Sequence, residues 1–312
     1  MHNDVRKLTE GAMIAAVMGV LLLIDRQMAG LLLGYFLFIL PLPMVLYSAR
    51  YGMKNSMIVF VAIMILSLMF GSLQTIFYMF AESLIGLCYG TGIYHKRSRS
   101  MILAMTLVIG AVVEVFAMIV LASVFGFDIA GEIAAYSDLL IEMDGMMGLG
   151  ITSMVNLEQF VIDCLVIAAV MTGVLEGAVT HMLSQMMLKR LHFVLEPPKA
   201  LKDMYMPKWA GYAALVAVVV YFYTAMNPMK EEMMQIVLQA IGMASYLFLI
   251  VMGIIAGIVY VQVCHPTLSR WIYGLIVLMG VLFGMFMCVA GFLYITTNLH
   301  SLLMKGKDGY ES

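Results

Sequence analysis

Charged residues are scarce in this sequence. Only 12% of its 312 residues are Asp, Glu, Lys or Arg, whereas 63% are hydrophobic and the mean hydropathy is +1.01. Because soluble domains carry about 25% charged residues, this composition argues against one and predicts a protein embedded in a lipid bilayer. The net charge of −2 offers no attraction to nucleic acid.

Several catalytic signatures are missing as well. The sequence contains no G-x-x-x-x-G-K-[ST], no H-E-x-x-H and no G-x-S-x-G. These absences argue against ATP hydrolysis through a P-loop and against the familiar zinc-protease and serine-hydrolase arrangements. We therefore expect a protein that is not an enzyme and that needs no cofactor.

Metal-binding patterns are also lacking. Cys88, Cys164, Cys264 and Cys288 lie far apart and form no C-x-x-C pair, so they are interpreted as small buried hydrophobic residues. The 33 methionines are spread through nearly every hydrophobic run, whereas a copper-export site would need them clustered with cysteine or histidine. The sequence therefore predicts no metal site.

Long hydrophobic runs dominate what is present. A run of about 20 apolar residues matches the thickness of the hydrocarbon core, and a continuous run favours a helix over a strand. Residues 8–24 and 28–48 are predicted to form a transmembrane hairpin. Further spans are predicted at 56–70, 74–94, 101–125, 153–188, 209–224, 234–263 and 271–297. The predicted fold is an all-α, polytopic transmembrane helix bundle of about 8–10 spans.

Two of these runs are unusual in length. Residues 153–188 would form a helix of roughly 50 Å, so this segment must tilt, break or protrude from the bilayer. The last run, 271–297, is either one span or two short ones. With nine spans the tail would lie outside, yet Lys305 and Lys307 favour the inside, which supports a short re-entrant segment within 271–304.

The charged segments between the runs predict domains and orientation. A basic, proline-containing linker at 191–208 separates a bundle at 1–190 from additional helices and a tail at 209–312. The N-terminus, the turn at 49–54, residues 96–99 and this linker carry the basic residues on one side, whereas the acidic break at 126–152 has no Lys or Arg. By the positive-inside rule, we expect a multi-pass membrane protein with a cytoplasmic N-terminus.

Polar side chains inside the spans are the candidate functional residues, because ionisable groups in a bilayer are costly and usually face a cavity or the bundle interior. They form stripes on three neighbouring spans, at 74–94, 101–125 and 153–188. The predicted ligand-binding residues are Gln74, Tyr78, Glu82, Glu114, Asn156, Gln159, Asp163 and His181. If the stripes converge, they line a polar pocket. The alternative is that each carboxyl is protonated or hydrogen-bonded to a neighbouring helix and binds nothing. Glu176 lies off its stripe and is interpreted as a packing or interfacial residue.

Small residues recur at four-residue spacing on several spans. Examples are Ala12/Ala16, Gly86/Gly90 and Gly173/Gly177, and such pairs allow helices to approach closely. In a chain with 27 glycines, ordinary packing within the bundle is the first interpretation of these pairs.

Three short motifs are spread over most of the chain: Leu8-Thr9-Glu10-Gly11-Ala12, Pro41-Leu42-Pro43 with Tyr51-Gly52, and Pro197-Pro198 followed by Met206-Pro207-Lys208-Trp209. They resemble the YybS-type bacterial membrane proteins, and this resemblance implies a location in a bacterial cytoplasmic membrane. More distantly, residues 8–188 resemble the six-helix substrate-binding component of energy-coupling-factor vitamin transporters. In that component an Ala-x-x-x-Ala on the first helix docks a membrane coupling subunit, and helices four to six build the ligand pocket. The resemblance implies docking through Ala12 and Ala16.

The sequence departs from that six-helix component in two ways. The outer loop between the first two spans is only Asp25–Gln27, so the acidic 126–152 segment would have to cover the pocket, and the spans in 209–304 have no counterpart. A related six-helix protein, MreD, is a scaffold without a solute. Three hypotheses follow: a small-solute binding or transport subunit without its own ATPase, a membrane scaffold for envelope or signalling proteins, and a proton-coupled secondary transporter.

Overall fold

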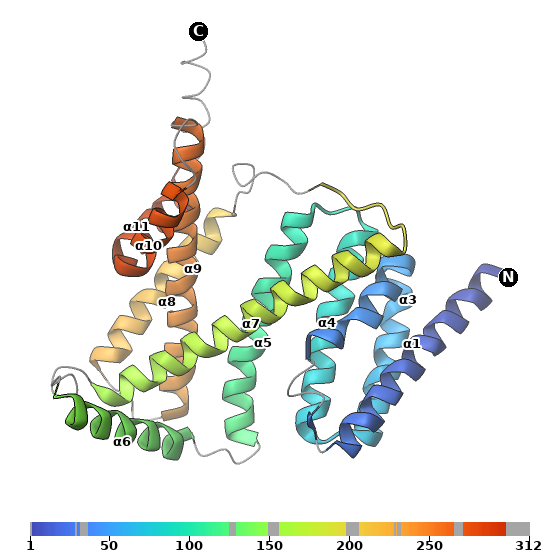
Figure 1. Cartoon of the computed structure of the whole chain (residues 1–312), viewed down its shortest axis with the longest axis horizontal. Coiled ribbons are helices and arrows are strands. Elements are labelled where there is room, and N and C mark those ends of the chain that lie inside the picture. The colour runs from blue at the N-terminus through green and yellow to red at the C-terminus, as the bar shows by residue number, and fades with distance from the viewer. Residues whose placement is uncertain are drawn as a thin grey trace, which may run out of the picture. The chain divides into compact units, whose positions relative to one another are not determined.

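The computed structural model describes residues 2–28, 30–31, 37–124, 129–148, 156–197, 206–227, 229, 232–264 and 271–297. Every regular element in these ranges is helical, which confirms the predicted all-α fold (Figure 1). The elements are α1 (His2–Gln27), the 3-10 helix η1 (Leu37–Ile39), α3 (Pro41–Phe70), α4 (Leu73–Tyr94), α5 (Arg99–Val124), α6 (Ile129–Met147), α7 (Leu157–Arg190), α8 (Lys208–Met226), α9 (Glu232–Cys264), α10 (Trp271–Leu282) and α11 (Gly284–Thr296).

Seven of the described helices are long and apolar enough to cross a membrane, or up to eight if the bent pair α10–α11 forms one span. Among the described residues, seven is one fewer than the predicted 8–10 spans, and eight is the lower limit of that range. The long 153–188 run is predicted to tilt, break or protrude from the bilayer. Helix α7 runs unbroken for 34 residues, so no break occurs within the described part of that run. The segment at 126–152, interpreted from sequence as a break, contains the 19-residue helix α6.

Two compact units divide the chain. Unit 1 comprises Met1–Gly126 and Ala169–Lys199, and unit 2 comprises Phe127–Ala168 and Ala200–Ser312. The division falls inside α7, whereas the predicted domain boundary followed residue 190. The N-terminal part of α7 joins unit 2 because its polar side chains hydrogen-bond to α8 and α9, as described below.

Helix α3 of unit 1 consists of two segments that meet at Gly52, whose φ of 71° and ψ of 179° interrupt the helix. Contacts with α4 give the direction of each segment: Met44 lies against Gly86, Ala49 against Gly90, and Phe60 against Phe80. The first segment therefore runs along α4 in the same direction, and the second runs in the opposite direction. This reversal lies within the turn predicted at 49–54, and its positive φ favours glycine.

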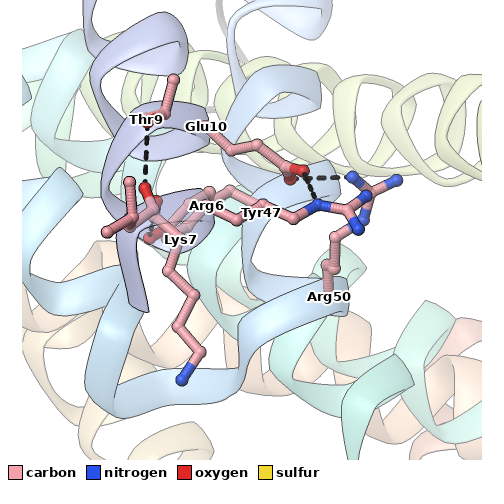
Figure 2. A network of polar contacts seen from close by, with 7 residues as sticks. Arg6, Lys7, Thr9, Glu10, Tyr47 and Arg50 are labelled. Atoms are coloured by element: carbon pink, nitrogen blue, oxygen red, sulfur yellow. Dashed lines mark hydrogen bonds and ion pairs between the residues drawn. The ribbon is translucent and has the colours of Figure 1, made fainter. Parts of the chain in front are cut away.

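A network at the start of α1 ties this helix to α3 (Figure 2). The Glu10 carboxylate accepts hydrogen bonds from Arg6 Nε at 3.0 Å and from Arg50 Nη1 at 2.7 Å. The Tyr47 hydroxyl donates to the backbone carbonyl of Lys7 at 3.1 Å. Two long-range contacts therefore anchor the N-terminal end of α1 in unit 1.

Most basic residues of unit 1 lie at the end that contains this network, and Arg26 in the last turn of α1 is an exception. The Arg50 guanidinium lies 5.9 Å from the centre of the Phe193 ring, which follows α7, and Leu188 packs in a cluster with residues of α3, α4 and α5. The opposite end of the unit holds Asp25, which accepts a hydrogen bond from Thr75 at 3.0 Å. The basic residues are therefore unevenly distributed between the two ends, and the orientation of the unit in the membrane stays a prediction.

Unit 2 has a separate core between α8, α9 and α11. Its buried residues are Ala214, Val218, Leu249, Met252, Ala256, Cys288, Tyr294 and Ile295. The α10–α11 pair bends by 105° around Phe283, so the final hydrophobic run is broken. The predicted position of the C-terminal tail, with Lys305 and Lys307, lies outside the described residues.

Candidate functional site

Helix α4 positions the central polar residues of unit 1. Its N-cap is Ser72, whose side chain accepts a hydrogen bond from the Thr75 amide. From there Tyr78 and Glu82 follow at helical spacing and are buried, as is the adjacent Ser83. The helix therefore directs a carboxyl group into the protein interior.

Three carboxyl groups meet in the interior of unit 1. Glu82 of α4 is 0% exposed and Glu176 of α7 is 8% exposed. The two groups lie close enough to interact directly, and Glu114 of α5 interacts electrostatically with both. In the described structure, the four oxygens of Glu82 and Glu176 have no hydrogen-bond donor outside this carboxyl pair. Such a buried group carries the full cost of its lost hydration.

Glycine contacts bring α5 and α7 together beside these carboxyls. A Cβ atom at Gly110 would lie 2.5 Å from the Gly173 carbonyl oxygen, and one at Gly177 would lie 3.0 Å from the Thr106 carbonyl oxygen. The two backbones thus touch where side chains would keep them apart. This contact confirms that the Gly173/Gly177 pair serves packing within the chain.

Further polar groups without partners extend along the same helices. Nine of the ten buried side-chain nitrogen and oxygen atoms that have no hydrogen-bond partner in the described structure belong to unit 1. They are both oxygens of Glu82 and of Glu176, the hydroxyls of Ser83, Thr180 and Ser184, Oε1 of Gln185 and Nε of Arg99. Native proteins leave few such atoms, so this concentration requires an explanation such as a bound ligand, ion or water.

A hydrogen-bonded cluster continues this polar region toward the basic end. Tyr89 is buried, and its hydroxyl lies 3.1 Å from His181 Nδ1 and accepts a hydrogen bond from Gln185 Nε2 at 3.0 Å. Arg99 acts electrostatically on both Tyr89 and His181. We call these polar residues of α4, α5 and α7 the polar column. Its members are Glu82, Ser83, Tyr89, Arg99, Glu114, Glu176, Thr180, His181, Ser184 and Gln185.

Unit 2 contains a second polar network, which links α7, α8 and α9. The Asp163 carboxylate accepts hydrogen bonds from the Tyr221 hydroxyl at 2.7 Å and from Gln159 Nε2 at 3.0 Å. Gln239 Nε2 in turn donates to Gln159 Oε1. Gln239 is 0% exposed, and its own Oε1 lacks a partner in the described structure. This network is closer to satisfied than the polar column.

The predicted ligand-binding residues are thus distributed over two units. Tyr78, Glu82, Glu114 and His181 lie in unit 1, whereas Asn156, Gln159 and Asp163 lie in unit 2. Gln74 is exposed near the start of α4. Ligand binding by any of these residues stays a prediction, and so does partner docking by Ala12 and Ala16, which are exposed on α1.

Glu176 is the residue that the sequence interpretation undervalued. Together with Thr180 and Ser184 it forms its own polar stripe at four-residue spacing. This stripe can be recognised in the sequence, but the predicted stripe on this span starts from Asp163, which faces a different set of helices. Tyr221 and Gln239 were also missed, because nothing local marks which helices will pack beside Asp163.

Among the described residues, no group of three or more His, Cys, Asp or Glu side chains could hold a metal ion.

These features define a polytopic helical membrane protein with ionisable groups buried inside its bundle. Residues 16–296 match the model of a family described as predicted membrane protein (DUF2232), and the chain belongs to that family. No curated protein and no solved structure matches the chain significantly. The comparisons therefore support membrane integration, and they identify neither a solute nor a partner protein.

Proposed function

We propose that the protein is a small-solute binding or transport subunit of a bacterial cytoplasmic membrane, without its own ATPase. The observation that supports this proposal best is the buried carboxyl pair of unit 1 together with five further buried polar atoms there that have no hydrogen-bond partner in the described structure. A buried polar atom without a hydrogen bond costs about 1–3 kcal/mol, so a packed, ligand-free interior of this composition is unfavourable. A solute that pairs with Glu82, Glu176 and neighbouring hydroxyls would remove that cost.

The proposed site lies between α4, α5 and α7, with Tyr78, Glu82, Glu114 and Glu176 as its central residues. The basic end of the unit would face the cytoplasm, in keeping with the positive-inside rule. His181 and the polar column would then extend from the solute toward the cytoplasmic side. The exposed Ala12 and Ala16 on α1 would be available to a membrane coupling subunit.

Thermal unfolding of purified protein in the presence of vitamins and metabolites tests the proposal. At least one compound is expected to raise the melting temperature of the unmutated protein, and E82Q is expected to abolish that shift because it removes a central carboxylate. E142Q is the matched control, since Glu142 is exposed on α6 of unit 2. A full panel without any shift in the unmutated protein would count against solute binding.

Two other functions remain candidates, each favoured by one observation. The exposed Ala12/Ala16 face of α1 favours a membrane scaffold, which predicts stable co-purification with a partner and no effect of E82Q. The buried carboxyl pair favours a proton-coupled secondary transporter, because acids inside a membrane bundle serve as proton carriers. Uptake into proteoliposomes that is driven by a pH gradient alone would support the transporter over the subunit.

A further inference from the structure

We propose that the occupant of the unit 1 site is a small ammonium cation, held between Glu82 and Glu176, and that its binding displaces a proton from this carboxyl pair. This inference rests on the proposed function, because it names the class of solute that the site would take.

The charges around the pair provide the first step. The ionisable groups that act on Glu82 are the carboxyls of Glu176 and Glu114. All three carboxyls act on the hydroxyl of Tyr78, which lies one turn before Glu82 on α4. In the described structure, no lysine, arginine or histidine is among the groups that act on Glu82, Glu114 or Glu176. A site with this charge inventory repels anions and favours a cation.

The second step concerns the kind of cation. No group of three or more acidic, histidine or cysteine side chains among the described residues is arranged to ligate a metal ion. An ammonium group instead donates up to three hydrogen bonds in different directions, so its acceptors need not converge at metal-ligand distance. The carboxyls of Glu82 and Glu176 have no hydrogen-bond donor other than each other in the described structure. The hydroxyls of Ser83, next to Glu82 in sequence, and of Thr180, one turn after Glu176, have no partner there either.

The third step is the proton balance. Two adjacent carboxylates buried in a medium of low dielectric constant cannot both remain charged without a counter-ion, so the empty pair holds at least one proton. Binding then proceeds as R-NH3⁺ plus Glu-COOH to give Glu-COO⁻ paired with R-NH3⁺, with release of H⁺. Charge in the interior is conserved in this exchange, which avoids burial of an additional net charge.

Isothermal titration calorimetry of the full-length protein tests this exchange. The probes are propylammonium and propane-1,3-diammonium chloride, with neutral propan-1-ol, anionic propanoate, NaCl and KCl as comparison arms. Each titration is made in two buffers that differ in ionisation enthalpy, so the proton count follows from the difference in measured heat. We expect at least one ammonium probe to bind and to release about one proton per molecule bound.

Three variants accompany the titrations. E82Q and E176Q keep the side-chain shape, and each is expected to weaken ammonium binding roughly 100-fold, since a buried partner charge is lost. E142Q is expected to bind as the unmutated protein does. Melting temperatures measured without ligand identify any variant that fails to fold. If one glutamine variant fails to fold, ammonium binding by the other is compared with that of the unmutated protein.

The outcomes separate the two proposals. Ammonium binding without proton release, or binding that both glutamine variants retain, overturns this inference. Binding confined to propanol, propanoate, metal ions or uncharged metabolites also overturns it, while solute binding as such stands. If neither these probes nor the metabolite panel binds, solute binding and the ammonium inference both fail.

Discussion

At the residue scale, Glu10 links two parts of unit 1 that are far apart in sequence. Its carboxylate joins Arg6 within α1 to Arg50 on α3, and the Arg50 guanidinium also lies over the Phe193 ring. E10Q removes the negative charge and leaves both arginines without their anionic partner. Because these side chains are partly exposed, the expected loss in free energy of unfolding is modest, about 1 kcal/mol.

Thermal or denaturant unfolding of E10Q at low and high ionic strength measures that loss. The difference from the unmutated protein should shrink as salt screens the ion pairs. E142Q again serves as the control, with no expected change. A loss of stability that does not respond to salt would show that Glu10 acts through packing rather than through charge.

At the element scale, the glycine contact between α5 and α7 lies beside Glu176 and sets how closely these two helices approach. A Cβ atom at Gly173 would collide with the backbone of α5 at Gly110 and Ala111. We therefore expect G173A to lower the free energy of unfolding by about 1–3 kcal/mol, because the two helices would have to separate. Glu176 lies one turn further along α7, so the same separation should weaken solute binding.

A glycine elsewhere provides the matched control for this prediction. Nothing lies within 4 Å of a Cβ atom added at Gly145 in α6. G145A should therefore be neutral or stabilising by up to about 1 kcal/mol, since alanine is the better helix former. Equal unfolding midpoints for G173A and G145A would contradict the proposed importance of the α5–α7 contact.

At the scale of the whole molecule, the distribution of charge in unit 1 predicts its orientation. Lys96 lies at the basic end of this unit, after α4, and Gln74 lies at the opposite end of the same helix. In a chain whose four native cysteines are replaced by serine, K96C should react with a membrane-impermeant maleimide only after the cells are permeabilised.

The complementary position should behave in the opposite way. Q74C is expected to react in intact cells, because Gln74 is exposed at the non-basic end of α4. Labelling of K96C but not Q74C in intact cells would invert the proposed orientation. It would then place the N-terminus outside.

The sequence by itself determined that this is a helical membrane protein, roughly where its hydrophobic runs lie, and that the chain turns near Gly52. Those features follow from hydrophobicity and glycine conformation, which are properties of short stretches of chain. It also indicated Tyr78, Glu82, Glu114 and His181, because an ionisable or polar residue in an apolar run is conspicuous wherever the run packs.

Only the tertiary structure decided which of these residues come together. Glu176 of α7 meets Glu82 of α4, where Tyr89 of α4 also hydrogen-bonds to Gln185 of α7. Asp163, on the same helix as Glu176, instead pairs with Tyr221 of α8. Both outcomes depend on contacts between segments distant in sequence. A long helix such as α7 can therefore contribute polar residues to two cores, and no single stripe along it predicts both.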